Sequence, residues 1–240
     1  MLKLAINHSL FPWSGAPQAY NSKLDFFLAA YLRFSANGFG VCSVTYRDIT
    51  EAIGLSTNDA HAVPKARKKI NGVIRNLLSR KGELYAEDFI TIGAPDKKEC
   101  EIKNGEIFKI PVEDMHTHQK TPYILVGTDE FCKIISAAKE ARIKSAELFA
   151  LYALIKSFMR PTGVEEDDGN ILGCWLLREH ITKTLDISTP TYMKYRRVLE
   201  ENGLIFFKQG QARISPALFS TTNEPEVWAA IEETISGNEG

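Results

Sequence analysis

Apolar positions divide the chain into segments of helical and extended character. Two strongly apolar stretches with helical spacing cover residues 24–34 and 148–158. After each of them the pattern predicts a short extended piece, a helix of about two turns, and then a longer helix with one apolar stripe. The stripes of these longer helices comprise Ile70, Ile74, Leu77 and Leu78 in the first, and Tyr192, Tyr195 and Leu199 in the second.

Between these two series, residues 123–127 are predicted as a strand, and Thr128 is placed to cap the helix that follows. Neither glycine nor proline occurs between Asp129 and Arg160. The pattern is therefore compatible with one unbroken helix that continues to Phe158.

The extended pieces and short helices form an internal repeat. Residues 42–56 and 174–188 align at a constant offset of 132 residues, and each segment follows an apolar helix and precedes a basic one. Identical residues occupy four pairs of positions: Cys42 and Cys174, Ile49 and Ile181, Thr50 and Thr182, and Ser56 and Ser188.

Capping and turn residues mark the limits of the helices in both copies. Thr45 is placed to cap the first short helix, and Gly54 can adopt the left-handed conformation that ends it. In the second copy Asp186 takes the place of the glycine, and Ser188 or Thr189 caps the next helix, with Pro190 near its first position. This order predicts a helix-turn-helix.

A β-hairpin is predicted after each basic helix. The second basic helix, residues 190–201, ends at Asn202-Gly203, and a strand, a turn at Gln209-Gly210 and a returning strand follow. The hairpin of the first copy is longer, and Lys103-Asn104-Gly105-Glu106 is its candidate type I′ turn.

Residues 188–205 (STPTYMKYRRVLEENGLI) closely resemble the recognition helix and first wing strand of bacterial winged helix-turn-helix proteins. The resemblance covers roughly residues 146–215, and more weakly residues 24–85, where extra residues at 58–63 and Pro64 delay the basic helix. It implies an α+β, mostly helical fold with two tandem winged helix-turn-helix domains. Tandem chains of this size resemble replication initiators and regulators of bacterial plasmids and phages.

Together with these patterns, the resemblance implies an N-terminal winged-helix domain with an extended hairpin over residues 1–120 and a C-terminal one over residues 121–222, with a boundary near residues 119–122. An acidic helix and tail, residues 223–240, follow them. Residues 225–235 carry Val227, Ile231 and Ile235 on one stripe, which either covers the second domain or serves dimerisation or partner docking.

Charge is distributed unevenly, although 29 Lys and Arg nearly balance 30 Asp and Glu in the 240 residues. Residues 60–81 hold seven cations and no acid, and residues 189–213 carry a net charge of +3. The compensating acids lie at residues 165–168 and in the last 26 residues, which hold five Glu and no base. Basic charge on both predicted recognition helices is what phosphate binding requires.

We expect the DNA contacts to come from the outward faces of the two basic helices and from the second hairpin. Lys194 and Arg197 can reach phosphates or guanine edges, while Thr189 and Thr191 suit phosphates or thymine methyl groups. The expected contact residues are Lys65, Arg67, Lys68, Asn71, Arg75, Thr189, Thr191, Lys194, Arg196, Arg197, Lys208 and Gln211.

Other chemistries receive less support from the sequence. His116-Thr117-His118, beside Asp114, loosely resembles the paired histidines of rolling-circle nickases, with Tyr192 or Tyr195 as the nominal nucleophile. The middle residue is Thr, however, and no partner histidine lies nearby, so we expect no enzyme, metal or cofactor. The cysteines, Cys42, Cys100, Cys132 and Cys174, form no CxxC pair and are expected to be buried and reduced.

The start of the chain lacks the apolar core of a signal peptide, and no stretch approaches the ~20 apolar residues of a membrane span. We therefore expect a cytoplasmic protein that binds double-stranded DNA sequence-specifically, in association with the nucleoid or a plasmid. Replication initiation or plasmid maintenance at repeated origin sites is the first expectation, and a repressor at an operator is the alternative. Self-association or contact with the replication or transcription machinery is compatible with either role, and a protein-interaction scaffold remains a further possibility.

Overall fold

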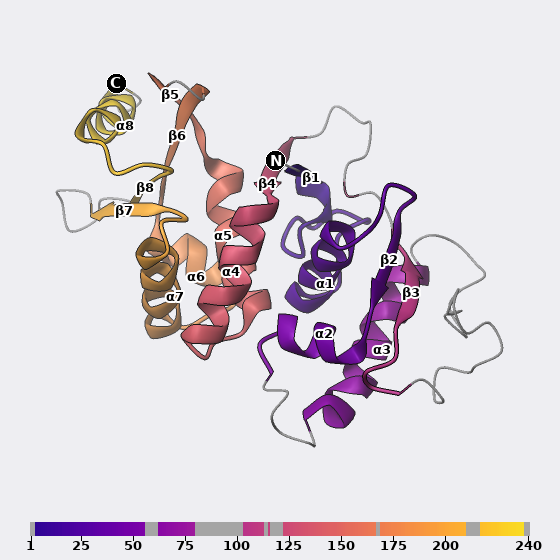
Figure 1. Cartoon of the computed structure of the whole chain (residues 1–240). Helices are drawn as coiled ribbons and strands as arrows, with labels where there is room; N and C mark the ends of the chain where they lie inside the picture. The colour runs from indigo at the N-terminus through magenta and orange to yellow at the C-terminus, as the bar shows by residue number, and fades with distance from the viewer. Residues whose placement is uncertain are drawn as a thin grey trace. The chain divides into compact units, whose positions relative to one another are not determined.

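The computed structural model describes residues 3–55, 62–79, 103–112, 115, 122–166, 169–209 and 217–237 (Figure 1). The fold is mixed α+β, with helices and small antiparallel sheets. The chain divides into two compact units, Met1–Glu147 and Leu148–Gly240.

The first unit contains a two-stranded sheet built from distant parts of the chain. Strand β1 (Lys3–Asn7) pairs antiparallel with β4 (Tyr123–Gly127), and Leu4 lies opposite Val126. The division into units therefore falls 27 residues beyond the predicted domain end at residue 120, because this pairing holds the segment after residue 122 in the first unit. The short helix η1 (His8–Leu10) follows β1.

Residues 128–158 form two helices, although the sequence pattern was compatible with a single long helix. Helix α4 (Thr128–Glu140) ends before Arg142, whose φ of 50° is left-handed, and α5 (Ser145–Phe158) then begins. A non-glycine residue in this conformation breaks the helix without any glycine or proline. Thr128 is the first helical residue rather than the cap, and Glu130 Oε2 accepts a 2.6 Å hydrogen bond from the Gly127 amide.

The remaining elements of the first unit follow the order that the sequence predicts. They are α1 (Lys23–Phe34), β2 (Val41–Val44), α2 (Tyr46–Ala52), α3 (Ala62–Ser79) and β3 (Phe108–Pro111). Strand β2 pairs antiparallel with β3. The predicted cap is confirmed, since Thr45 Oγ1 accepts from the Asp48 amide at 3.1 Å and the Asp48 carboxylate accepts from the Thr45 amide at 2.9 Å. The buried rings of Tyr46 and Phe108 join α2 to β3, with centroids 4.8 Å apart.

The predicted turn before β3 forms, but its type is not I′. The Glu106 amide donates to the Lys103 carbonyl at 3.0 Å. A type I′ turn needs positive φ at both central residues, and neither Asn104 nor Gly105 has it. The Asn104 carbonyl accepts instead from the Arg47 amide at 3.1 Å, which ties this turn to α2.

The second unit surrounds one four-stranded sheet. Its strands are β5 (Arg160–Glu166), β6 (Gly169–Leu176), β7 (Phe206–Gln209) and β8 (Ala217–Ser220), in the order β5-β6-β8-β7. Helices α6 (Arg178–Leu185) and α7 (Thr189–Glu201) lie between β6 and β7 in sequence. A hairpin follows α7 as predicted, since β7 pairs antiparallel with β8. The turn predicted at Gln209-Gly210 is wrong, however, because Gln209 is the last residue of β7 and pairs with Ala217. Residues 210–216, which join the two strands, lie outside the described residues.

Helix α8 (Pro225–Gly237) covers this sheet, in agreement with the first of the two alternatives for the terminal segment. Val227, Trp228 and Ile231 are buried against Leu218, and Phe206 packs beside them. The side chain of Ile235 lies outside the described residues.

The internal repeat is visible in the backbone of both units. Cys42 and Cys174 lie in the equivalent strands β2 and β6, and α2 and α6 begin at the equivalent residues Tyr46 and Arg178. Gly54 has φ of 84° and Asp186 has φ of 47°, so a left-handed residue ends the short helix in each copy, as predicted. The offset of 132 residues thus relates two copies of one local structure.

Candidate nucleic-acid interface

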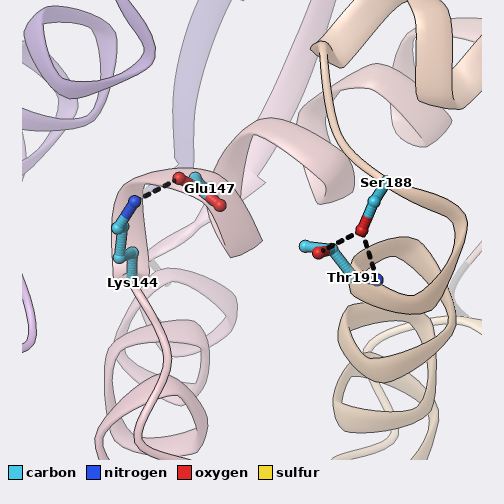
Figure 2. Close-up of polar contacts among 4 residues, drawn as sticks. All are labelled: Lys144, Glu147, Ser188 and Thr191. Carbon is cyan, nitrogen blue, oxygen red and sulfur yellow. Dashed lines mark hydrogen bonds and ion pairs between the residues drawn. The ribbon is translucent and has the colours of Figure 1, made fainter.

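The start of α7 is fixed by the predicted cap. Ser188 Oγ accepts from the Thr191 amide at 3.3 Å and lies 2.8 Å from Thr191 Oγ1 (Figure 2). Pro190 occupies the first turn, where its missing N–H costs no hydrogen bond. Thr189 is exposed beside this cap, whereas the hydroxyl of Thr191 already has a partner in Ser188.

The two faces of α7 differ as the sequence predicts. Tyr192, Tyr195 and Leu199 are buried in the core of the unit. Met193, Lys194 and Arg197 are exposed on the opposite face. A helix held by one apolar stripe can present its other face to a groove of DNA.

The three cations of α7 have different surroundings. Lys194 forms no ion pair with any residue that the structure describes. The Arg197 guanidinium lies 2.7 Å from the Glu201 carboxylate one turn later, and this hydrogen bond raises the pKa of Arg197. Arg196 is half-buried, with its Cζ 3.6 Å from the centroid of the Phe207 ring. Arg196 therefore links α7 to strand β7, and Lys194 is the one of the three charges that neither a described acid nor a described aromatic ring engages.

Lys208 on β7 is engaged by the terminal helix. Its Nζ lies 2.9 Å from Glu232 Oε1 of α8, and its side chain keeps 41% of its surface exposed. A phosphate would have to compete with this carboxylate for the lysine. Gln211, the other candidate on the hairpin, lies outside the described residues.

Helix α3 presents a second basic face in the first unit. Ile70, Ile74 and Leu77 are buried as predicted, together with Ala66 and Val73. Exposed on the other side are Lys68, Lys69, Arg75 and Asn76. Leu78 and Lys65 belong to α3, but their side chains lie outside the described residues.

Two candidates on α3 are not placed as the sequence predicts. Asn71 is only 9% exposed, so the expectation that it lies outside the buried stripe is wrong. It lies three residues before the buried Ile74, on the same side of the helix, which turns this amide toward the core. Arg67 is half-buried, with its guanidinium 4.5 Å from the centroid of the Tyr46 ring on α2. Arg67 therefore braces α3 against α2 as well as adding positive charge.

Three further exposed cations lie on α3 or on α6, the helix before α7, and were not among the predicted DNA-contact residues. Lys69 neighbours Lys68 on α3, and Arg178 and Lys183 lie on α6. In helix-turn-helix proteins the first helix of the motif crosses the DNA backbone, so cations on it are suited to phosphate contacts. Lys69 could have been identified from its place in the basic run of residues 65–69, and Arg178 and Lys183 from the short helix that precedes α7.

The cysteines offer no nucleophile in either copy of the repeat. Burial raises the pKa of the Cys42 thiol and of the Cys174 thiol to about 12. Both therefore stay protonated near neutral pH. Cys132 is exposed on α4, against the expectation that the thiols are buried, and Cys100 lies outside the described residues.

The tyrosines of α7 are poorly placed for strand cleavage. Tyr192 is 1% exposed, and burial raises the pKa of its hydroxyl, which the nearby Arg196 guanidinium only partly opposes. Tyr195 is also buried. A nucleophile must reach a scissile phosphate, which neither hydroxyl does in this conformation. His116, His118 and Asp114 lie outside the described residues.

No protein-family model matches this chain, and no curated protein matches it either. Within the part of the chain that the structure describes, none of the helices has both the length and the apolar character to cross a membrane.

Proposed function

We propose that the chain binds double-stranded DNA through two tandem winged helix-turn-helix domains, with α3 and α7 as recognition helices. One observation carries this proposal. A strand, a two-turn helix and a left-handed residue recur at a constant offset of 132 residues, and a longer helix with outward cations follows each copy. The sheet order β6-β8-β7 beside α6 and α7 supports the assignment of β7 and β8 as a wing.

The charge distribution supports a nucleic-acid partner. Lys68, Lys69 and Arg75 project from α3, and Lys194 and Arg197 project from α7. Each phosphate that such cations neutralise releases condensed counterions, which supplies much of the binding free energy. Thr189 and Met193, exposed beside Lys194, are suited to contacts with thymine methyl groups or the sugar–phosphate backbone.

Two recognition helices in one chain favour a DNA site with two parts. A protein of this kind acts at repeated sites, and we propose replication initiation or plasmid maintenance as its role, in the cytoplasm where such DNA lies. The resemblance of residues 188–205 to bacterial winged helix-turn-helix proteins supports this choice. A repressor that binds one operator is the second candidate, because the same geometry serves both roles.

Duplex binding is tested with the Lys194→Ala, Arg197→Ala double variant. We expect it to weaken binding about tenfold at moderate salt and to reduce the slope of log affinity against log salt by roughly one to two. Fluorescence anisotropy with a labelled duplex measures both quantities.

The matched control removes two positive charges outside both basic helices, through Lys133→Ala and Lys144→Ala. Lys133 is exposed on α4, and Lys144 forms a surface ion pair with Glu147 (Figure 2). If control and test variants lose the same affinity, the recognition-helix assignment for α7 is wrong. A chain with no duplex affinity at physiological salt would instead indicate a protein-interaction scaffold.

The biological role is tested by the DNA that the full chain selects from plasmid and chromosomal fragments. An iterated motif at an origin supports replication initiation. A single site at a promoter contradicts that role and supports the repressor.

A further inference from the structure

Gly72 lies in the interior of α3, on its exposed face. Glycine in the middle of a helix destabilises it relative to alanine, because the backbone loses more conformational freedom on folding. An exposed interior glycine therefore needs a reason, and α3 is otherwise free of glycine.

None of the usual structural reasons for a glycine applies at position 72. Gly72 is seven residues from the end of α3 at Ser79, so it does not terminate the helix. Its φ lies outside the positive range that favours glycine. A Cβ added here would meet no atom of the described residues within 4 Å, apart from the helix itself, so packing against them does not exclude a side chain.

The surroundings of Gly72 on the helix surface are strongly basic. Residues three and four positions away are its neighbours on the same face. At Gly72 these neighbours are all exposed and polar, and three of the four are cations: Lys68, Lys69, Arg75 and Asn76. A ligand held by these side chains together must pass directly over Gly72.

We propose that α3 approaches bound DNA most closely at Gly72, where the missing side chain lets the helix backbone reach the duplex. This inference rests on the proposed function. Close approach of a backbone to a ligand is a general reason for glycine, and phosphate contacts require the flanking cations to lie within hydrogen-bond distance. A side chain at position 72 would hold the helix away and lengthen all of these contacts at once.

The experiment compares Gly72→Ala and Gly72→Gln with the unaltered full chain. Binding is measured by anisotropy with a labelled mixed-sequence duplex of about 30 base pairs, roughly three helical turns. Both variants keep every charge. We expect Gly72→Ala to raise Tm by about 2–4 °C, yet to weaken binding by about threefold to tenfold. The longer side chain of Gly72→Gln should weaken binding further.

Ser136→Ala on α4 is the matched control, because Ser136 is exposed in the interior of a helix outside the basic face. It should raise Tm slightly and leave binding unchanged. Unchanged binding by both Gly72 variants, with the unaltered chain still bound, would overturn this inference and leave the proposed function intact. A lower Tm in Gly72→Ala would also overturn it, since the glycine would then serve the fold. If the unaltered chain does not bind the duplex, the proposed function itself fails.

Discussion

The two copies of the repeat share a backbone plan but treat their charges differently. On α7, Arg197 is paired with Glu201 and Arg196 is stacked on Phe207. On α3 the exposed cations lie on a helix that has no acidic residue at all. Lys68 and Lys69 form no ion pair with any described residue. Helix α3 thus carries five Lys and Arg and no acid, whereas α7 carries three together with two Glu, so α3 offers more positive charge to a ligand.

Under the proposed function, this difference predicts that the two helices contribute differently to DNA binding. Arg197 and Arg196 are held in defined positions, which favours specific contacts at the cost of available charge. The face of α3 is better suited to nonspecific attraction of phosphates. We therefore expect α3 to dominate the salt dependence of binding, and α7 to contribute more to the choice of sequence.

The largest effect should come from removal of the α3 charges, Lys68→Ala, Lys69→Ala and Arg75→Ala together. We expect about a hundredfold weaker binding, and a salt slope reduced by roughly two to three, since each lost phosphate contact removes about 0.9 from the slope. Salt titrations of duplex binding measure both values. Equal losses in this variant and in the α7 double variant would contradict the predicted difference between the two helices.

A smaller effect, on stability, should distinguish the two left-handed turns. Gly54→Ala places a Cβ 3.0 Å from the Ile143 carbonyl oxygen at φ of 84°, so we expect a loss of roughly 1–3 kcal/mol in the free energy of unfolding. Asp186→Gly relieves a non-glycine residue at φ of 47° and should add roughly 0.5–1 kcal/mol. Denaturant unfolding measures both, and the same sign for the two changes would contradict the equivalence of the turns.

The smallest effect should come from Glu232→Gln on α8. The change removes the partner of Lys208 and leaves that charge for a phosphate, so we expect about twofold to threefold tighter duplex binding. Glu233→Gln is the control, because Glu233 is exposed on the same helix and pairs with no described cation. Equal gains in the two variants would show a general charge effect rather than release of Lys208.

Short-range signals predicted the parts of the fold that depend on neighbouring residues. The caps at Thr45 and Ser188 and the stops at Gly54 and Asp186 each arise within a few residues. The stripe of α7 was predictable for the same reason, because helical spacing alone sets it.

Features that depend on distant partners could not be predicted in this way. Nothing near Tyr123 indicates that its strand pairs with β1, more than a hundred residues earlier. The ion pair of Lys208 with Glu232 likewise depends on how α8 packs. Arg142 breaks a helix with no local breaker residue, and Asn71 is a polar side chain turned into the core. The strand pairing and the ion pair depend on segments far apart in the sequence, whereas the residue types around Arg142 and Asn71 do not indicate the conformations found there.

The pairing of β1 with β4 has a consequence for synthesis of the chain. Asn7 is paired with Tyr123 and Lys3 with Gly127, so β1 can pair only after the ribosome has made the more than one hundred residues that lead to β4. At ordinary translation speeds of about 5–20 residues per second, the delay is roughly 6–25 seconds. The folded unit buries the apolar side chains of Leu4 and Ile6. Until β4 has been made, these side chains are exposed on the nascent chain and accessible to chaperones and proteases.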